Sequence, residues 1–326
     1  MNQSDKEKRT IEKLKRELGS DILSALNDPT VIEIMLNPDC SLWVEKHGGH
    51  PEKVGKINPA KSKAIIGTVA DALGTIATTE SPIVEGELPI DGSRFEGVLP
   101  PIVSNPCFTI RKKATKIITL DEYVASGIIS DEQVKLIRDA IAEKKNIIIA
   151  GSTGSGKTTL VNAVIDGICD ASPNDRLVII EDTNEIQCKA ENTVIMRTSE
   201  NVDQTRLLKV ALRKRPDRII TGEVRGGEAL ALLKSWNTGH GGGVCTLHSN
   251  SAFDALERLE QMIGEVSERD MMRFISSSID LVIFIKRDET GTRKITEIVQ
   301  VDKMDHDSTR TYNTTSLLTT KKRETL

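Results

Sequence analysis

The chain has 326 residues, of which 38% are hydrophobic and 28% charged, enough material for two domains with sizeable cores. Its 44 Lys and Arg against 48 Asp and Glu give a formal net charge of −4, and aromatic residues make up 3%. This composition argues against a dedicated nucleic-acid binder, which usually carries a basic surface and stacking aromatic side chains. The polar first ten residues exclude a secretory signal there, and no apolar stretch reaches the roughly 18 residues of a membrane-spanning helix.

The five cysteines show no spacing typical of a metal site. Their odd number in a long chain also argues against a disulfide scaffold, so we expect reduced thiols in a cytosolic protein and no zinc site. The cysteines are Cys40, Cys107, Cys169, Cys188 and Cys245.

The first part of the chain predicts a domain of helices and antiparallel strands over residues 1–115. Apolar residues recur every three to four positions in 6–27 and again in 61–73, which indicates two helices. Residues 31–36 and 42–45 have the pattern of a hairpin around Asn37-Pro38-Asp39, and 83–110 reads as short strands and turns. We interpret residues 51–58 as a loop.

The second part, residues 116–306, predicts an α/β domain. Ser130 is a candidate N-cap for a helix over 130–143. Five continuous apolar runs alternate with helical segments, which is typical of a parallel sheet covered on both faces. These runs are 147–150, 177–180, 218–221, 244–247 and 281–285. Residues 307–326 lack apolar periodicity, and we expect a mobile tail there.

A glycine-rich loop between the first run and its helix predicts phosphate binding. Residues 151–158, GSTGSGKT, match the P-loop pattern G-x-x-x-x-G-K-[ST]. In this pattern the backbone N–H groups surround phosphate oxygens, Lys157 contributes a positive charge, and the Thr158 hydroxyl binds Mg²⁺. The predicted nucleotide-binding residues here are Gly151, Ser152, Thr153, Gly154, Ser155, Gly156, Lys157, Thr158 and Thr159.

Two acidic segments follow later strands. The run 218–221 is followed by Gly222 and Glu223, and Glu223 is a candidate to polarise the attacking water. The run 177–180 is followed by Glu181, Asp182 and Glu185, which would face the nucleotide at the carboxyl end of a parallel strand. They are candidates to hold the water shell of Mg²⁺, with Glu181 and Glu223 acting through water. The alternatives are a solvated acidic loop and an ordinary carboxylate at a strand end.

Histidines and arginines supply further candidates. His240 and His248 flank a triglycine and a strand. They are eight residues apart with no partner ligand, which makes a zinc site a poor interpretation. A sensor of bound nucleotide is the better interpretation. A polar turn is the alternative.

Arg94 and Arg111 of the first domain could reach the phosphates across the domain cleft, since a guanidinium is always charged and planar. Arg213 and Arg215 could act in the same way, or all four could form a solvated basic face.

These motifs occur in an order that resembles the secretion and traffic ATPases of type II and type IV systems. The quoted stretches are GSTGSGKT (151–158), VIIEDTNEI (178–186), RPDRIITGEVRGGEA (215–229) and TGHGGGVCTLHSNSAFDALERL (238–259). The family names them Walker A, Asp box, Walker B and His box. In the first domain, residues 31–48 and 100–113 are similar to the branch that serves type IV secretion and conjugation. The four-cysteine zinc module of many type II exporters does not occur in the sequence.

The resemblance implies an N-terminal α+β domain followed by a RecA-like P-loop domain, with ATP and Mg²⁺ between them. It implies a homohexameric ring on the cytoplasmic face of the inner membrane, in contact with inner-membrane secretion or conjugation components. ATP hydrolysis would then drive pilus assembly or substrate transfer. The catalytic roles fall on Glu223, Glu185, Arg94, Arg111 and His248, and Glu181, Asp182 and His240 join the nucleotide site; either Glu223 or Glu185 takes the proton.

Other functions remain as alternatives. A type IV pilus or type II secretion motor belongs to the same class, and a DNA translocase or helicase uses a similar ring. We expect no direct DNA binding, because the chain has no basic footprint. A scaffold that binds nucleotide without hydrolysis conflicts with the presence of Glu223, and a small-molecule kinase leaves the His box without a role.

Overall fold

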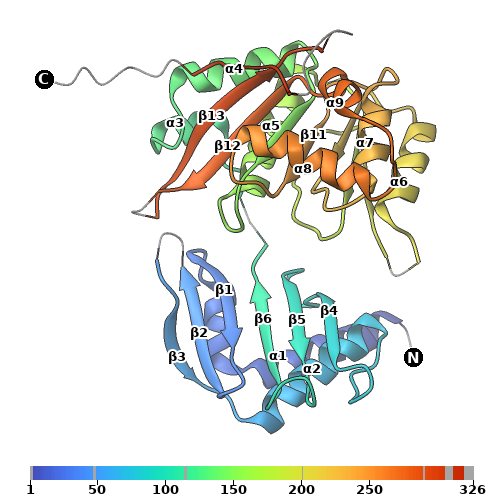
Figure 1. The fold of residues 1–326 in the computed structure, drawn as a ribbon. Helices are drawn as coiled ribbons and strands as arrows, with labels where there is room; N and C mark the ends of the chain where they lie inside the picture. Colours follow the sequence, from blue (N-terminus) through green and yellow to red (C-terminus); the bar gives the residue numbers. More distant parts are fainter. Residues whose placement is uncertain are drawn as a thin grey trace, which may run out of the picture. The chain divides into compact units, whose positions relative to one another are not determined.

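The computed structural model describes residues 3–46, 49–113, 116–199, 201–288, 291–304 and 311–318. The chain divides into two compact units, residues 1–115 and 116–326, which are considered separately below (Figure 1). Among the described residues, no helix is both long and apolar enough to cross a bilayer.

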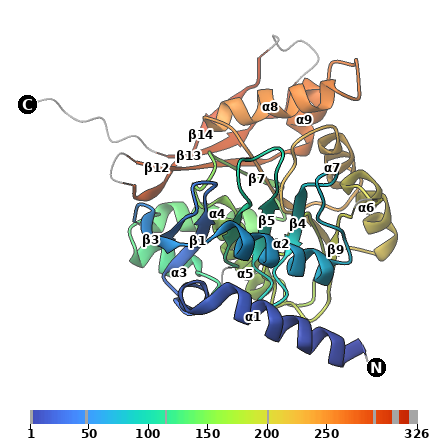
Figure 2. The same cartoon turned by 90° about the horizontal axis from the view of Figure 1, so that it is seen from below.

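The first unit is a six-stranded antiparallel sheet with two helices. The strand order is β3-β2-β1-β6-β5-β4. Helices α1 and α2 contact each other and pack on the sheet (Figure 2). Their apolar stripes, which include Leu14, Leu18, Ile65 and Val69, close one hydrophobic core with strand residues such as Phe95. The elements are α1 (Gln3–Asn27), β1 (Val31–Leu36), β2 (Ser41–Lys46), β3 (Glu52–Lys56), α2 (Pro59–Leu73), β4 (Ile83–Glu87), β5 (Arg94–Val98) and β6 (Cys107–Arg111).

Two features of this unit differ from the prediction. Residues 51–58 contain the strand β3 at the edge of the sheet, whose mostly exposed side chains lack the alternation that marks a half-buried strand. Helix α1 is interrupted at Gly19, whose φ of 77° belongs to the left-handed region that glycine adopts without strain.

The second unit is an eight-stranded sheet between two helical layers. The strand order is β14-β13-β12-β7-β11-β10-β8-β9. Helices α3, α4 and α5 pack on one face, and α6 to α9 cover the other, with α8 in front in Figure 1. The elements are α3 (Leu120–Ala125), α4 (Asp131–Ala142), β7 (Ile147–Ala150), α5 (Lys157–Ala171), β8 (Leu177–Glu181), β9 (Thr193–Arg197), α6 (Gln204–Ala211), a 3₁₀ turn (Leu212–Lys214), β10 (Arg218–Thr221), α7 (Glu228–Trp236), β11 (Val244–Leu247), α8 (Ala252–Gly264), α9 (Met272–Ser278), β12 (Leu281–Arg287), β13 (Arg293–Val301) and β14 (Thr314–Ser316).

The continuous apolar runs form the centre of this sheet, as predicted. In β7, Ile147 and Ile149 enter the core beneath α5, whereas Ile148 and Ala150 enter the core beneath α7 and α8. Each fully buried isoleucine contributes about 1.5–3 kcal/mol of hydrophobic free energy, so both faces must be covered. Strand β7 lies between β11 and β12 and is parallel to both.

The sheet is mixed, not fully parallel as predicted. Strand β13 runs antiparallel to β12, and β14 runs antiparallel to β13. Residues 314–316 lie within the predicted mobile tail, yet they pair with β13 and the nearby Tyr312 is buried. The prediction is therefore wrong for 311–318. The other tail residues from 307 onward lie outside the described part of the chain.

A buried ion pair joins several elements of this unit. The side chain of Arg218, at the start of β10, is fully buried, and its Nε donates to Oδ2 of Asp175 at 2.8 Å. The same guanidinium donates to the carbonyl oxygens of Ile141 and Gly242. Because a buried charge is costly without partners, Arg218 holds α4, the α5–β8 turn and the loop before β11 together.

We expect Arg218→Met to lower the free energy of unfolding by about 3 kcal/mol, because several buried acceptors lose their donor at once. Urea unfolding of the full chain, followed by circular dichroism, measures the change. Arg138→Met removes an exposed pair with Asp121 and should cost less than about 1 kcal/mol. Equal losses in the two variants would contradict a central role for Arg218.

Candidate functional site

The residues predicted to carry chemistry gather at the carboxyl edge of the second sheet. Strands β7, β8, β10 and β11 are parallel, so the segments that follow them meet at one edge. The glycine-rich loop 151–156 follows β7 and leads into α5. In open α/β sheets this edge is where ligands bind.

The loop has the features of a phosphate cradle. A Cβ on Gly151 would lie 2.2 Å from the carbonyl oxygen of Ile285 and 2.7 Å from Oγ of Ser155, so only glycine fits there. Gly156, the N-cap of α5, has a φ of 98° and no side chain that could cap the helix. The first N–H groups of α5 have no carbonyl partner within the helix, and this is the end of a helix at which an anion binds.

Lys157 lies buried within this loop. Its Nζ donates to the carbonyl oxygens of Gly151 at 2.9 Å and Ser152 at 3.0 Å, and it lies 3.1 Å from Nδ1 of His248. Oγ of Ser155 is buried with no hydrogen-bond partner in the described structure. The loop thus offers a cation and a buried hydroxyl to a phosphate, while Ser152 and Thr153 are exposed at its tip.

His248 joins Lys157 to Glu223. Nε2 of His248 lies 2.8 Å from Oε1 of Glu223, while Nδ1 faces the Lys157 ammonium. Since an ammonium only donates, Nδ1 must accept and Nε2 must carry the hydrogen, which assigns the neutral Nε2–H tautomer. Burial, followed by the charge of Lys157, holds the pKa of His248 below its usual value, and the opposing effect of Glu223 is smaller.

Arg225 is the partner of Glu223 that the sequence motifs did not single out. Its Nη2 and Nε donate to Oε2 of Glu223 at 2.8 and 3.0 Å, and its Nη1 lies 3.8 Å from Oδ2 of Asp182. The Glu223 backbone is held as well, because Gln204 donates to its carbonyl oxygen. Oε2 of Glu223 is therefore held by Arg225, whereas Oε1 lies close to the His248 ring and has no hydrogen bond in the described structure.

The Asp-box residues divide into two groups. Glu181 is buried, and its Oε2 accepts the backbone N–H groups of Glu185 and Ile186. Its Oε1 faces Arg197 at 3.4 Å, and burial raises its pKa. In this structure the oxygens of Glu181 shape the loop, and its contact with Mg²⁺ through water stays a prediction. Asp182 is exposed and Glu185 is half-buried.

The loop after β8 is fastened to α5. Asn162 donates to the carbonyl oxygen of Glu185 and accepts from the backbone N–H of Gln187. Lys189 forms ion pairs of 2.7 and 2.8 Å with Asp166 and Asp170. No sequence signal marked Asn162 or Lys189, because the contacts depend on how α5 passes the loop.

His240 does not join this cluster within the chain. It precedes β11, whereas His248 follows it, so the two histidines lie at opposite ends of a strand of about 13 Å. The last glycine of the triglycine is closely packed, because a Cβ on Gly243 would lie 2.0 Å from Nε1 of Trp236. Close packing requires this glycine. The contact of His240 with nucleotide stays a prediction.

The arginines outside the cluster lie elsewhere in the fold. Arg94 of β5 and Arg111 of β6 are directly opposite each other in the first unit, and Glu87 and Glu33 are their outer neighbours. Their approach to a nucleotide stays a prediction. Arg213 and Arg215 are exposed beside the 3₁₀ turn before β10, at the edge of the sheet opposite the glycine-rich loop.

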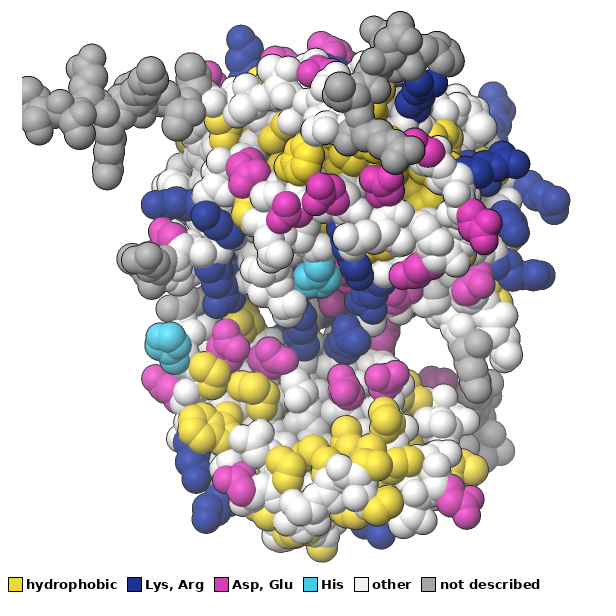
Figure 3. Space-filling view, viewed as in Figure 1, with side chains coloured by type: hydrophobic (Ala, Val, Ile, Leu, Met, Phe, Trp, Pro, Cys, Tyr) yellow, Lys and Arg dark blue, Asp and Glu magenta, His cyan; other side chains and the backbone are white. Residues whose placement is uncertain are grey.

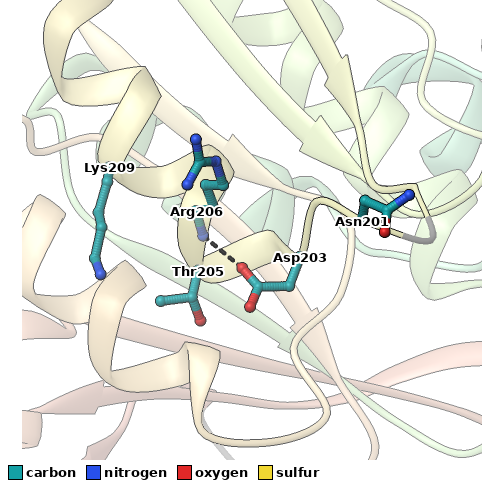
Figure 4. A pocket seen from close by; sticks show the side chains of 5 residues that line it. All are labelled: Asn201, Asp203, Thr205, Arg206 and Lys209. Carbon is teal, nitrogen blue, oxygen red and sulfur yellow. Dashed lines mark hydrogen bonds between the residues drawn. The ribbon is translucent and has the colours of Figure 1, made fainter.

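A separate pocket of about 280 Å³ lies at the start of α6 (Figure 4). It is lined by Asn201, Asp203, Thr205, Arg206 and Lys209. Oδ1 of Asp203 accepts the Arg206 backbone N–H at 2.7 Å and so caps the helix. The pocket contains none of the residues of the phosphate cradle, and its one carboxylate already has a structural role.

The fold and the cradle together define a P-loop nucleotide-binding protein. Comparison with known proteins narrows the class. Residues 57–324 match the family model described as type II/IV secretion system protein. The chain is 52% identical over 302 residues to the conjugal transfer protein TrbB of Rhizobium radiobacter, covering 93% of each. It is 30% identical over 325 residues to the type IV secretion system protein VirB11 of Bartonella quintana, covering 85% of this chain and 90% of that protein.

The solved structure of the pilus retraction motor PilT with bound ADP has a similar fold. The TM-score is 0.61 at 20% identity, over 82% of this chain and 77% of PilT. The chain belongs to the type II/IV secretion system protein family, and it is a homologue of conjugal transfer protein TrbB and of type IV secretion system protein VirB11. The α/β fold class and the family resemblance predicted from the sequence are confirmed.

The neutral state of His248 is testable in the nucleotide-free protein. We expect its ring to titrate below pH 6.5 in a histidine NMR titration. Because the unfolded chain binds this proton first as the pH falls, His248 should reduce stability below about pH 6.5. Lys157→Met should raise the midpoint and Glu223→Gln should lower it further. A midpoint above 6.5 in the unmodified protein would contradict the assigned tautomer.

Proposed function

We propose that this protein hydrolyses ATP with Mg²⁺ and that the reaction powers conjugative transfer or type IV secretion. The observation that carries the proposal is the continuous contact from Lys157 through His248 to Glu223 at the glycine-rich loop. It places the phosphate-binding cation on one side of the His248 ring, at 3.1 Å, and the candidate catalytic carboxylate on the other, at 2.8 Å. The relationship to conjugal transfer protein TrbB supports conjugation as the process served.

The chain's own groups suggest how the reaction proceeds. The N–H groups at the start of α5 and the Lys157 ammonium bind the phosphates, and Lys157 exchanges loop carbonyls for phosphate oxygens. Glu223 orients a water toward the γ-phosphate and accepts its proton, and ADP and phosphate are the products. Arg225 and His248 hold the two oxygens of Glu223 in place for this step.

The residues present fit a magnesium ion. The Thr158 hydroxyl lies in the first turn of α5, and the exposed Asp182 carboxylate is linked to Glu223 through Arg225. Thr158 would hold the ion directly, and Asp182 and Glu223 would hold it through water. When bound, Mg²⁺ neutralises charge that develops on the phosphate oxygens. Glu185 is a further candidate to orient the water, since its side chain is half-buried at the same edge.

We further propose a homohexameric ring at the cytoplasmic face of the inner membrane, bound to membrane components of the transfer system. Large apolar side chains of the first unit, including Leu73, Ile76 and Ile83, are exposed to solvent. Apolar side chains also gather on the face of that unit drawn in Figure 3. Exposed apolar patches commonly mark protein interfaces, so this surface supports assembly. Arg94 and Arg111 would complete the nucleotide site from the first domain.

A pilus motor is the second candidate, favoured by the likeness to the fold of PilT. This alternative implies the same ATP hydrolysis, but the reaction would power a pilus and not conjugative transfer. The 52% identity to TrbB favours conjugation over this alternative. We propose no direct DNA binding and no zinc site, given the net charge of −4 and the cysteine spacing.

Phosphate release and light-scattering mass test the proposal on one purified sample with Mg·ATP. Lys157→Ala should abolish nucleotide binding, while Glu223→Gln should retain binding and lose about 10²–10⁴-fold in turnover. A six-fold mass supports the ring.

Glu257→Gln, an exposed carboxylate on α8, is the matched control and should hydrolyse ATP at the unmodified rate. Unchanged turnover in Glu223→Gln would remove Glu223 from the mechanism. A protein that binds ATP without turnover would favour the scaffold alternative.

A further inference from the structure

The hairpin of β12 and β13 contacts the glycine-rich loop from the side away from Glu223. Arg287 is the last residue of β12, and it is paired in register with Arg293, the first residue of β13. Nε of Arg287 donates to the carbonyl oxygen of Gly154 at 3.0 Å. Neither arginine belongs to the motifs that mark the nucleotide site in the sequence.

The contact of Arg287 determines which way one peptide group of the loop faces. In a trans peptide the C=O and the following N–H point in opposite directions. With the Gly154 carbonyl directed outward to Arg287, the N–H of Ser155 must point inward. It does so, because it donates to the carbonyl oxygen of Ser152 inside the loop at 3.3 Å.

The backbone at this point needs an outside partner. Gly154 has a φ of 70°, in the left-handed region, where glycine can flip its peptide group at little steric cost. A hydrogen bond from a charged donor selects one of the two orientations. Arg287 is exposed, so no surrounding core packing fixes its side chain against the Gly154 carbonyl. The hydrogen bond itself holds the two groups together.

Arg293 supports the adjoining turn by packing. A Cβ on Gly156 would lie 3.0 Å from Cδ of Arg293, so the arginine stem covers this glycine closely. The hairpin therefore touches the loop at Gly154 and at Gly156. Ser155, whose N–H faces inward, lies between these two contacts.

We propose that Arg287 is a positioning residue, which holds the Gly154–Ser155 peptide with its N–H toward the bound phosphate. The proposal rests on the proposed function, because it requires that the loop binds a nucleoside di- or triphosphate. On binding, the Ser155 N–H exchanges the Ser152 carbonyl for a phosphate oxygen, while Arg287 keeps the Gly154 carbonyl. Arg287 itself makes no contact with the nucleotide.

The experiment compares Arg287→Met and Arg287→Lys with the matched control Lys286→Met. Lys286 precedes Arg287 and its side chain points to the opposite face of the strand, so its replacement removes the same charge without the contact. Affinities for ADP and for a non-hydrolysable ATP analogue are measured by titration of the full-length protein, and kcat and KM by phosphate release.

We expect Arg287→Met to weaken ADP and the ATP analogue by the same factor of about ten, since a hydrogen bond to a charged group is worth about that factor or more. KM should rise while kcat stays within about twofold. Arg287→Lys, which keeps a charged donor, should recover most of the affinity, and Lys286→Met should match the unmodified protein.

Three results would overturn the proposal: unchanged affinity in Arg287→Met, an equal loss in Lys286→Met, or a loss confined to the ATP analogue, which would indicate contact with the γ-phosphate. If Arg287→Met does not fold, an Arg287→Lys variant with tenfold weaker binding also counts against it, because the donor is retained. An unmodified protein that binds no nucleotide would instead refute the proposed function.

Discussion

The parallel direction of β7, β8, β10 and β11 is the constraint on which the site depends. The segments that follow these strands meet at the same edge, so parts of the chain that are about 25 to 100 residues apart in the sequence become neighbours. The result is a row of contacts from Lys157 to His248 and from Glu223 to Arg225. A neutral imidazole separates the lysine from the carboxylate, so the two charges do not pair directly.

That separation keeps both charges available for chemistry. A direct ion pair would neutralise Lys157 and leave less positive charge for a phosphate. Here the lysine is held mainly by carbonyl oxygens of its own loop, which an anion can replace. Glu223 is held by His248 and Arg225, both of which contact it from partly exposed positions. The phosphate-binding group and the carboxylate can therefore change partners independently.

Much of the fold and of the site follows from local sequence patterns. Continuous apolar runs predicted β7, β8, β10, β11 and β12, and the glycine spacing predicted the cradle, because both depend on neighbouring residues. Strands β3, β9, β13 and β14 were not predicted. Strands β3, β9 and β14 lie at sheet edges, and the burial of β13 does not follow a regular alternation.

The site residues that the sequence did not reveal were missed for two different reasons. Asn162 lies in an ordinary helical context, and only the folded chain brings it to the loop after β8. Arg225 is two residues from Glu223, but no pattern in the sequence shows that its side chain turns back to that carboxylate. His240 and His248 are close in sequence, yet β11 separates them, so the sequence alone did not show that only His248 joins the cluster. The hydrogen bonds of Asn162 and the ion pairs of Lys189 join α5 and the loop after β8 into one rigid unit. Arg225 and His248 lie outside that unit and are more exposed, so they can move more easily. When nucleotide is exchanged, the side chains of Arg225 and His248 should therefore shift first, while α5 keeps its position.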